Sequence, residues 1–290
     1  MRGNRRRASN GRMSAPQSVS SSLDLTGRRG VITGGGRGIG RAIALAFAER
    51  GADLLLVGRD ADTLAKAAAD LRRVGGTARE LALDLTAPDA HHRVVEVALD
   101  GGGIDLLVNN AGNVRAGRLT AATEDDVRAM LELNLVAPVL LTQAALPALL
   151  ASPNGGILLG ISSGIGLLPL PFYAVYAATK TGLSGFHHAL RRELTGSGVH
   201  VATLYPGATD TDMMASSQAG ESLGFGRRPV EDVVADLMTG LERGEHEINT
   251  ALPTRRGLQD LHRSDPLAVD AQLAPNLPEM EAAVQGHRSI

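Results

Sequence analysis

Residues 30–51 read GVITGGGRGIGRAIALAFAERG, which is a short apolar run, a glycine-rich turn and an apolar helical pattern that ends at Gly51. This order predicts a strand, a tight turn and a helix. Glycines in the turn, from Thr33 to Gly40, let the backbone approach a pyrophosphate, whose charge then faces free amides at the positive end of the helix. A glycine-rich turn alone is weak evidence, but here it lies in the strand and helix context that dinucleotide binding requires.

Short apolar runs alternate with helical patterns along most of the 290 residues. Continuous apolar runs separated by helices are typical of buried parallel strands whose right-handed crossovers place helices on both faces. We therefore expect an α/β fold: a single doubly wound (Rossmann) domain with a parallel seven-stranded sheet. The expected strands are Gly30–Thr33, Asp53–Val57, Thr77–Leu83, Ile104–Asn109, Gly156–Ile161, Val199–Leu204 and Glu247–Leu252.

Tyr176 and Lys180 lie one turn apart in a predicted helix, and Ser163 precedes the tyrosine by thirteen residues. A phenol, an ammonium and a hydroxyl that meet one carbonyl form a proton-transfer site. Lowering a tyrosine pKa from about 10 to about 7 takes about 4 kcal/mol. A unit charge about 4 Å away supplies roughly that much at an effective dielectric near 20, so Lys180 is expected to lower the phenol pKa. Taken alone, the pair is also compatible with an ordinary helix.

From about Leu25 to about Leu252 the chain resembles the short-chain dehydrogenase/reductase family. Signatures occur in the family's order: the glycine turn, Asp84 after an apolar strand, Asn109-Asn-Ala-Gly112, Asn134, Ser163 with Tyr176 and Lys180, and Pro206-Gly207 followed by Thr211. The resemblance implies hydride transfer between a nicotinamide cofactor and a carbonyl or secondary alcohol. A dinucleotide-sensing regulator with little turnover is the alternative, which retention of all four family catalytic residues disfavours.

The resemblance also implies residue roles. Tyr176 would donate the proton, Ser163 would fix the carbonyl oxygen, Lys180 would also anchor the nicotinamide ribose, and Asn134 would hold a water that links Lys180 to solvent. Asp84 and other cofactor candidates are also common as caps or turns. The expected cofactor-binding residues are Thr33, Gly34, Gly36, Arg37, Gly38, Ile39, Gly40, Arg59, Asp84, Leu85, Asn110, Ala111, Gly112, Tyr176, Lys180, Pro206, Gly207, Thr209 and Thr211.

The residues after the second predicted strand favour NADP(H) over NAD(H). Enzymes that use the unphosphorylated cofactor place an acid there for the ribose hydroxyls, whereas this chain has Gly58 followed by Arg59. Arg37 adds a second guanidinium, whose planar donors suit a 2′-phosphate. The alternative is that both arginines are solvated and that Asp60 caps the next helix, which leaves NAD(H) possible.

Apolar residues flank the expected substrate position, in residues 167–172 and at Met213-Met214, and they indicate a modest preference for an apolar carbonyl substrate. Tyr173 is expected to line the substrate or the core. Arg115 is expected either to reach an acid or to face water.

Composition excludes several classes of site and partner. The chain has no cysteine and no His-Glu-x-x-His spacing, so no metal site is expected, and the adjacent pairs His91-His92 and His187-His188 are expected at the surface. The net charge is −2 although the first twelve residues hold five arginines, which leaves an acidic body unsuited to nucleic acid. No apolar run approaches a membrane span, and the basic residues 1–22 lack the apolar core of a secretion signal, so we expect a cytoplasmic protein.

We expect three segments: a disordered basic tail at residues 1–22, the Rossmann-type domain at residues 23–252, and an extension at residues 253–290 on or near that domain. Apolar helices at residues 136–150 and 173–195 predict a homo-oligomer, because they carry more apolar surface than one sheet face hides. The proline-containing extension departs from the family pattern and favours a dimer over the tetramer.

Overall fold

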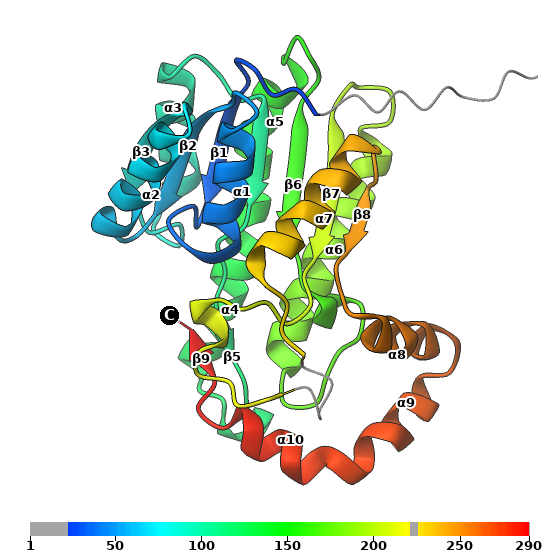
Figure 1. Ribbon diagram of the computed structural model, residues 1–290. Coiled ribbons are helices and arrows are strands. Elements are labelled where there is room, and N and C mark those ends of the chain that lie inside the picture. Colours follow the sequence, from blue (N-terminus) through cyan, green and yellow to red (C-terminus); the bar gives the residue numbers. More distant parts are fainter. Residues whose placement is uncertain (1–22, 221–225, 290) are drawn as a thin grey trace, which may run out of the picture.

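The computed structural model describes residues 23–220 and 226–289, so the predicted disorder of residues 1–22 lies outside the described residues. Its main element is a parallel seven-stranded sheet with strand order β3-β2-β1-β4-β6-β7-β8 (Figure 1). The strands are β1 Arg29–Thr33, β2 Asp53–Gly58, β3 Thr77–Ala82, β4 Leu106–Asn109, β6 Ile157–Ile161, β7 His200–Tyr205 and β8 Glu247–Asn249. The doubly wound fold predicted from the sequence is confirmed.

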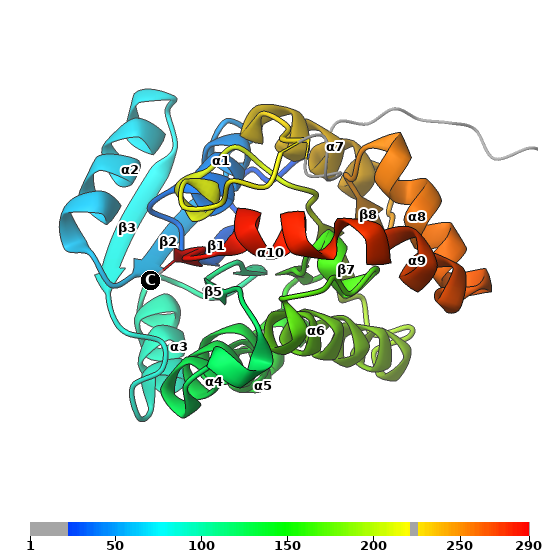
Figure 2. The ribbon, with the colours of Figure 1, turned by 90° about the horizontal axis from the view of Figure 1, so that it is seen from below.

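Helices cover both faces of the sheet, as Figure 2 shows from below. One face packs against α1 Gly38–Ala48, α2 Ala61–Arg73 and α7 Val230–Glu242, where Phe47, Leu64 and Leu237 are almost fully buried. The other face packs against α3 Ala90–Asp100, α5 Ala137–Leu150 and α6 Ala174–Glu193.

The last strand is shorter than the predicted Glu247–Leu252, because β8 ends at Asn249. The Asn249 side chain accepts a hydrogen bond from Ala251 N at 3.1 Å, which turns the chain out of the sheet. Pro253 then begins α8 and has no N–H for a strand ladder.

A one-turn π-helix, Glu132–Val136, joins α4 Glu124–Leu131 to α5 and turns Asn134 inward, where it is 1% exposed. Thr123 caps α4 by accepting a hydrogen bond from Asp126 N, and the run Thr123-Glu-Asp-Asp126 is an acidic capping sequence that favours this cap. The continuous run Glu124–Leu150 is long and apolar enough to cross a membrane by length and composition, with 33% of its most apolar window buried. Core helices of proteins outside membranes pass the same test, and Leu141 and Leu149 of this run pack on the sheet.

The extension forms an arc below the carboxyl edge of the sheet (Figures 1 and 2). It consists of α8 Pro253–Ser264, α9 Pro266–Leu273, a short 3₁₀ turn at Ala274–Asn276, α10 Leu277–Val284 and β9 Arg288–Ser289. Prolines occupy the first turn of each α-helix, where their missing N–H has no helical partner anyway. Strand β9 pairs antiparallel with β5, Val114–Arg115, a pairing that the sequence did not predict.

The surface assignment of the histidine pairs was wrong for His187, which is 1% exposed. Its ring lies against the backbone of Gly160, where an added Cβ would meet His187 Cε1 at 1.6 Å. The Nδ1 atom lies 3.1 Å from Thr203 Oγ1. One member of an adjacent pair on α6 therefore faces the sheet, and Gly160 on β6 provides the space for its ring.

Candidate active site

A cavity of about 1010 Å³ lies along the carboxyl edge of the sheet. Of the residues predicted for cofactor binding and catalysis, three do not line it: Thr33, Gly40 and Asn134. The residues that do line it are Gly34, Gly36, Arg37, Gly38, Ile39, Arg59, Asp84, Leu85, Asn110, Ala111, Gly112, Ser163, Tyr176, Lys180, Pro206, Gly207, Thr209 and Thr211.

Thr33 and Gly40 do not line the cavity, but they contact residues that do. Thr33 Oγ1 accepts hydrogen bonds from the backbone N–H groups of Asn110 at 2.9 Å and Ala111 at 3.1 Å, which joins the ends of β1 and β4. A Cβ on Gly40 would meet both Asn110 Nδ2 and Gly34 O at 2.4 Å, so only glycine fits this approach. The glycine turn and the Asn110 turn are therefore fixed to each other.

Arg37 and Arg59 lie at the end of the cavity beyond β1 and β2, beside Asp84. Hydrogen bonds from Thr86 are the main cause that lowers the pKa of Asp84, and the charge of Arg59 contributes. Asp60 caps α2 by accepting a hydrogen bond from Thr63 N at 2.6 Å. A Cβ on Gly58 would make only ordinary contacts with Leu64, the nearest at 3.5 Å, so packing does not exclude a side chain at this position.

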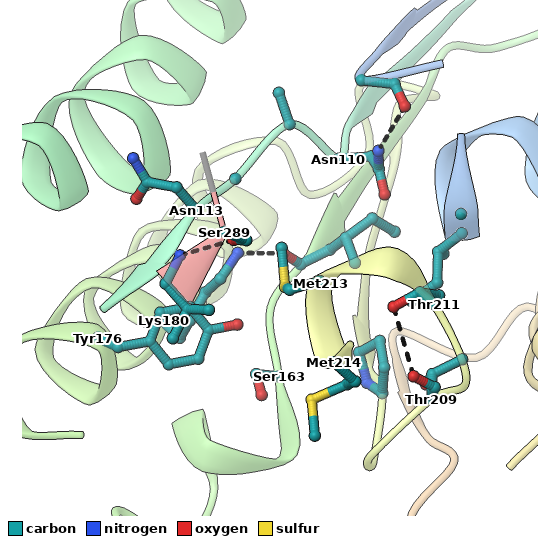
Figure 3. A pocket seen from close by; sticks show the side chains of 18 of the residues that line it. Asn110, Asn113, Ser163, Tyr176, Lys180, Thr209, Thr211, Met213, Met214 and Ser289 are labelled. Atoms are coloured by element: carbon teal, nitrogen blue, oxygen red, sulfur yellow. Dashed lines mark hydrogen bonds between the residues drawn. The ribbon is translucent and has the colours of Figure 1, made fainter. Parts of the chain in front are cut away.

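Tyr176 and Lys180 project from α6 into the same part of the cavity as Ser163 (Figure 3). Lys180 Nζ donates to Ile161 O at 2.9 Å and lies 5.8 Å from the centre of the Tyr176 ring. Burial raises the pKa of Tyr176 to about 12, against a hydrogen bond with Ser163 that lowers it. Burial also lowers the pKa of Lys180 to about 8. The phenol pKa is thus raised rather than lowered as expected, because loss of solvent outweighs the Ser163 hydrogen bond, and the Lys180 ammonium donates to the Ile161 carbonyl.

Asn134 lies behind the catalytic candidates instead of in the cavity. Its Nδ2 donates to Asn113 O at 2.9 Å, and its Oδ1 accepts from Asn113 N at 2.8 Å. Only Gly112 separates Asn134 from Lys180, since a Cβ there would lie 3.1 Å from Asn134 Oδ1 and 3.4 Å from Lys180 Nζ. The π-turn therefore places the asparagine amide next to the lysine.

The far end of the cavity has an apolar wall with a few polar groups. Leu168, Leu170, Met213 and Met214 line it, in agreement with the apolar pattern of the sequence. Tyr173 lines it too and is 3% exposed.

The extension contributes three lining residues that sequence reasoning missed: Arg255, His287 and Ser289. Ser289 of β9 is held at the cavity by β5, because its Oγ accepts a hydrogen bond from Val114 N at 3.1 Å. No sequence motif identifies these residues as part of the cavity. The only indication was that the chain departs from the family pattern after residue 252.

Arg115 faces an acid, one of its two predicted alternatives. Its Nε donates to Asp126 Oδ1 at 2.9 Å, and Arg288 of β9 binds the same carboxylate at 2.8 Å. Within residues 23–220 and 226–289, no group of three or more His, Asp or Glu side chains is placed to hold a metal ion.

A model of the short-chain dehydrogenase family matches residues 29–222. The chain belongs to the short-chain dehydrogenase/reductase family. It is 36% identical to a short chain dehydrogenase of Pseudocercospora fijiensis over 198 residues, which is 67% of this chain and 64% of that relative. It is 35% identical to the 3-oxoacyl-[acyl-carrier-protein] reductase of Vibrio cholerae over 66% of this chain and 77% of that one.

Among solved structures, the chain is similar to the L-sorbose reductase of Gluconobacter frateurii complexed with NADPH and L-sorbose. The TM-score is 0.73 and the identity 26%, and the match covers 80% of this chain and 97% of that one. The chain is therefore an oxidoreductase of this family. A dinucleotide would fit the site, because Gly34, Gly36 and Gly38 of the glycine turn line the cavity and the start of α1 faces it, where free backbone amides can meet a pyrophosphate.

Proposed function

We propose that the protein reduces a carbonyl of a small, partly apolar substrate with NADPH, or oxidises the matching secondary alcohol with NADP⁺. One observation carries the proposal: Tyr176, Lys180 and Ser163 share one cavity with the glycine turn and its two arginines. The bound cofactor supplies or accepts a hydride at C4 of its nicotinamide.

In the reductive direction, Ser163 donates a hydrogen bond to the carbonyl oxygen, and Tyr176 gives that oxygen its proton. With a pKa raised to about 12, the Tyr176 phenol is protonated at neutral pH and available as an acid. The Lys180 pKa of about 8 keeps the ammonium mostly charged, so it stabilises the phenolate that forms. Asn134 and Asn113 hold the lysine side of the cavity in place.

NADP(H) preference is supported by the two arginines and by the space left at Gly58. Arg37 and Arg59 have exposed guanidinium groups at the cavity end where the adenosine ribose of a cofactor on the glycine turn would lie. A Cβ at Gly58 would make only ordinary contacts with Leu64, so the first atom of a side chain is not excluded there by packing. The similar sorbose reductase is described as an NADPH complex, which agrees with this proposal.

The test is oxidation of NADPH and NADH with a panel of aldehydes and ketones, for the wild type and for Tyr176→Phe. We expect the variant to bind NADPH normally and to lose turnover, because the ring packs alike and only the proton donor is removed. Turnover within about tenfold of wild type would exclude Tyr176 as the acid, since one general acid contributes about 10²-fold or more. NADPH binding without turnover of any carbonyl would favour the dinucleotide-sensing alternative.

We also propose a cytoplasmic homodimer. The supporting observation is the helical run Glu124–Leu150 of α4 and α5, where only 33% of the most apolar window is buried, which leaves apolar side chains uncovered. Light scattering coupled to size exclusion tests this: a monomer at micromolar concentration refutes the helix interface, and a tetramer refutes only the expected effect of residues 253–290. We retain residues 23–252 as the catalytic domain and residues 253–290 as its extension.

A further inference from the structure

The far end of the cavity holds a cluster of polar groups that the proposed chemistry does not use. The cluster consists of Arg255, Tyr173 and His287, all of which line the cavity. The Tyr173 ring centre lies 6.3 Å from that of Tyr176 and 6.0 Å from that of His287. Burial raises the pKa of Tyr173 to about 12, against a hydrogen bond with Ser217 and, to a smaller degree, the charge of Arg255, so the guanidinium lies near the phenol.

Sheet topology places Arg255 on the substrate side of the reacting groups. Arg37 and Arg59 follow β1 and β2, Ser163 follows β6, and Arg255 follows β8 at the opposite edge of the sheet. A dinucleotide whose pyrophosphate lies on the glycine turn and whose nicotinamide reaches Tyr176 ends short of β8. Arg255 therefore faces the space beyond the carbonyl.

The charges of the cluster suit a monoanion. Burial is the main cause that lowers the pKa of Arg255 and of His287. Arginine stays protonated even so, whereas a histidine with a lowered pKa is neutral at pH 7, so Arg255 is the cationic side chain among these three and Tyr173 and His287 are neutral hydrogen-bonding groups. A planar guanidinium fork matches a carboxylate, whereas a phosphate dianion calls for more than one cation.

We propose that Arg255 is a specificity residue that binds the carboxylate of an oxo-acid substrate whose carbonyl lies a few carbon atoms away at Tyr176. This deepens the proposed function and rests on it. The substrate's carbon chain lies against Leu168, Leu170 and Met213, and Tyr173 lies between its two polar ends. His287 is held for this role by Ser216, whose Oγ lies 3.1 Å from His287 Nδ1.

The test compares aliphatic oxo acids, with the carbonyl moved stepwise from the carboxylate, against their methyl esters. Wild type, Arg255→Gln, Arg255→Lys and the control Arg263→Gln are assayed with NADPH; Arg263 is exposed on the same helix and pairs with Asp260. We expect the wild type to prefer an acid over its ester. In Arg255→Gln, kcat/KM for that acid should fall by about tenfold or more, with the ester and NADPH binding unchanged, since a charge-assisted pair is lost. Arg255→Lys should keep part of the preference, and Arg263→Gln all of it.

Equal use of acid and ester by the wild type refutes the proposal, as does an equal loss on both in Arg255→Gln, which indicates a structural role. Calorimetric titration of each acid into the NADPH-loaded protein separates this inference from the proposed function. Acid binding that requires Arg255, without turnover, supports the carboxylate site and refutes reduction. Turnover of neutral carbonyls with no acid binding supports reduction and refutes the site.

Discussion

The buried imidazole of His187 makes the stability of the domain depend on pH in a predictable way. The ring is 1% exposed, and its Nε2 has no hydrogen-bond partner within the described residues. Burial is the first cause that lowers its pKa, from 6.5 to about 4, and the charges of His188 and Lys180 add to the shift. A proton on His187 therefore destabilises the fold.

The size and sign follow from the two pKa values. Lowering the pKa of His187 from 6.5 to about 4 corresponds to a free energy of about 3 kcal/mol. Because the folded-state pKa is below the unfolded one, the unfolded chain binds the extra proton between pH 4 and 6.5. The stability that the protein gains by keeping His187 neutral is therefore fully present above about pH 6.5. It is lost as the pH falls from about 6.5 to about 4.

The assay is urea unfolding at about pH 7 and about pH 4.5 for wild type, His187→Gln and the exposed control His92→Gln. We expect His187→Gln to be less stable than wild type at pH 7, because the space beside Gly160 is filled less well. On acidification both proteins should lose stability. The loss in the free energy of unfolding should be about 2 to 3 kcal/mol smaller for His187→Gln than for wild type. His92→Gln should follow wild type. Parallel losses in wild type and His187→Gln would refute the reasoning, because the pH dependence would then come from other groups.

Three further predictions concern the cavity and its closure. Arg59→Ala should reduce the ratio of kcat/KM for NADPH to that for NADH by roughly tenfold or more, measured by steady-state kinetics, and equal use of both cofactors by the wild type would contradict it. Gly40→Ala should abolish dinucleotide binding in a fluorescence titration, because its Cβ would meet Asn110 Nδ2 and Gly34 O at 2.4 Å; Gly185→Ala, with open space around its Cβ position, is the control. Asp126→Asn should destabilise the protein by about 1 to 3 kcal/mol and speed proteolysis near β9, because Asp126 pairs with both Arg115 and Arg288. Unchanged cleavage would show that this carboxylate does not hold β9 in place.

Features that depend on local sequence were predictable, because the residues that determine a turn, a cap or a helical spacing are close neighbours in the chain. The glycine turn and the Thr123 cap are of this kind, and so is the one-turn spacing of Tyr176 and Lys180. The inward turn of Asn134 lies between α4 and α5, and the π-turn that produces it has no sequence signature that we recognised.

The missed features depend on residues far apart in the chain. His187 is buried because Gly160, on a strand under its helix, lacks a side chain. Strand β9 has two residues and pairs with a two-residue partner about 174 positions earlier, too short a segment for a periodic pattern. The pKa of Tyr176 was predicted from one pairwise charge, whereas the burial that determines its direction is a property of the whole cavity.

The order of strands in the sheet connects the two specificity proposals. Cations lie at both ends of one cavity: Arg37 and Arg59 lie beyond β1 and β2, and Arg255 lies beyond β8. Tyr176, the proposed proton donor, lies between them. A 2′-phosphate and a substrate carboxylate bound at these ends would orient the cofactor and the oxo acid toward each other. Neither charge lies at the reacting carbon, so each acts by fixing position, and removal of either should raise KM more than it lowers kcat. Loss of Tyr176 should do the opposite, and that contrast distinguishes the positioning residues from the chemical one.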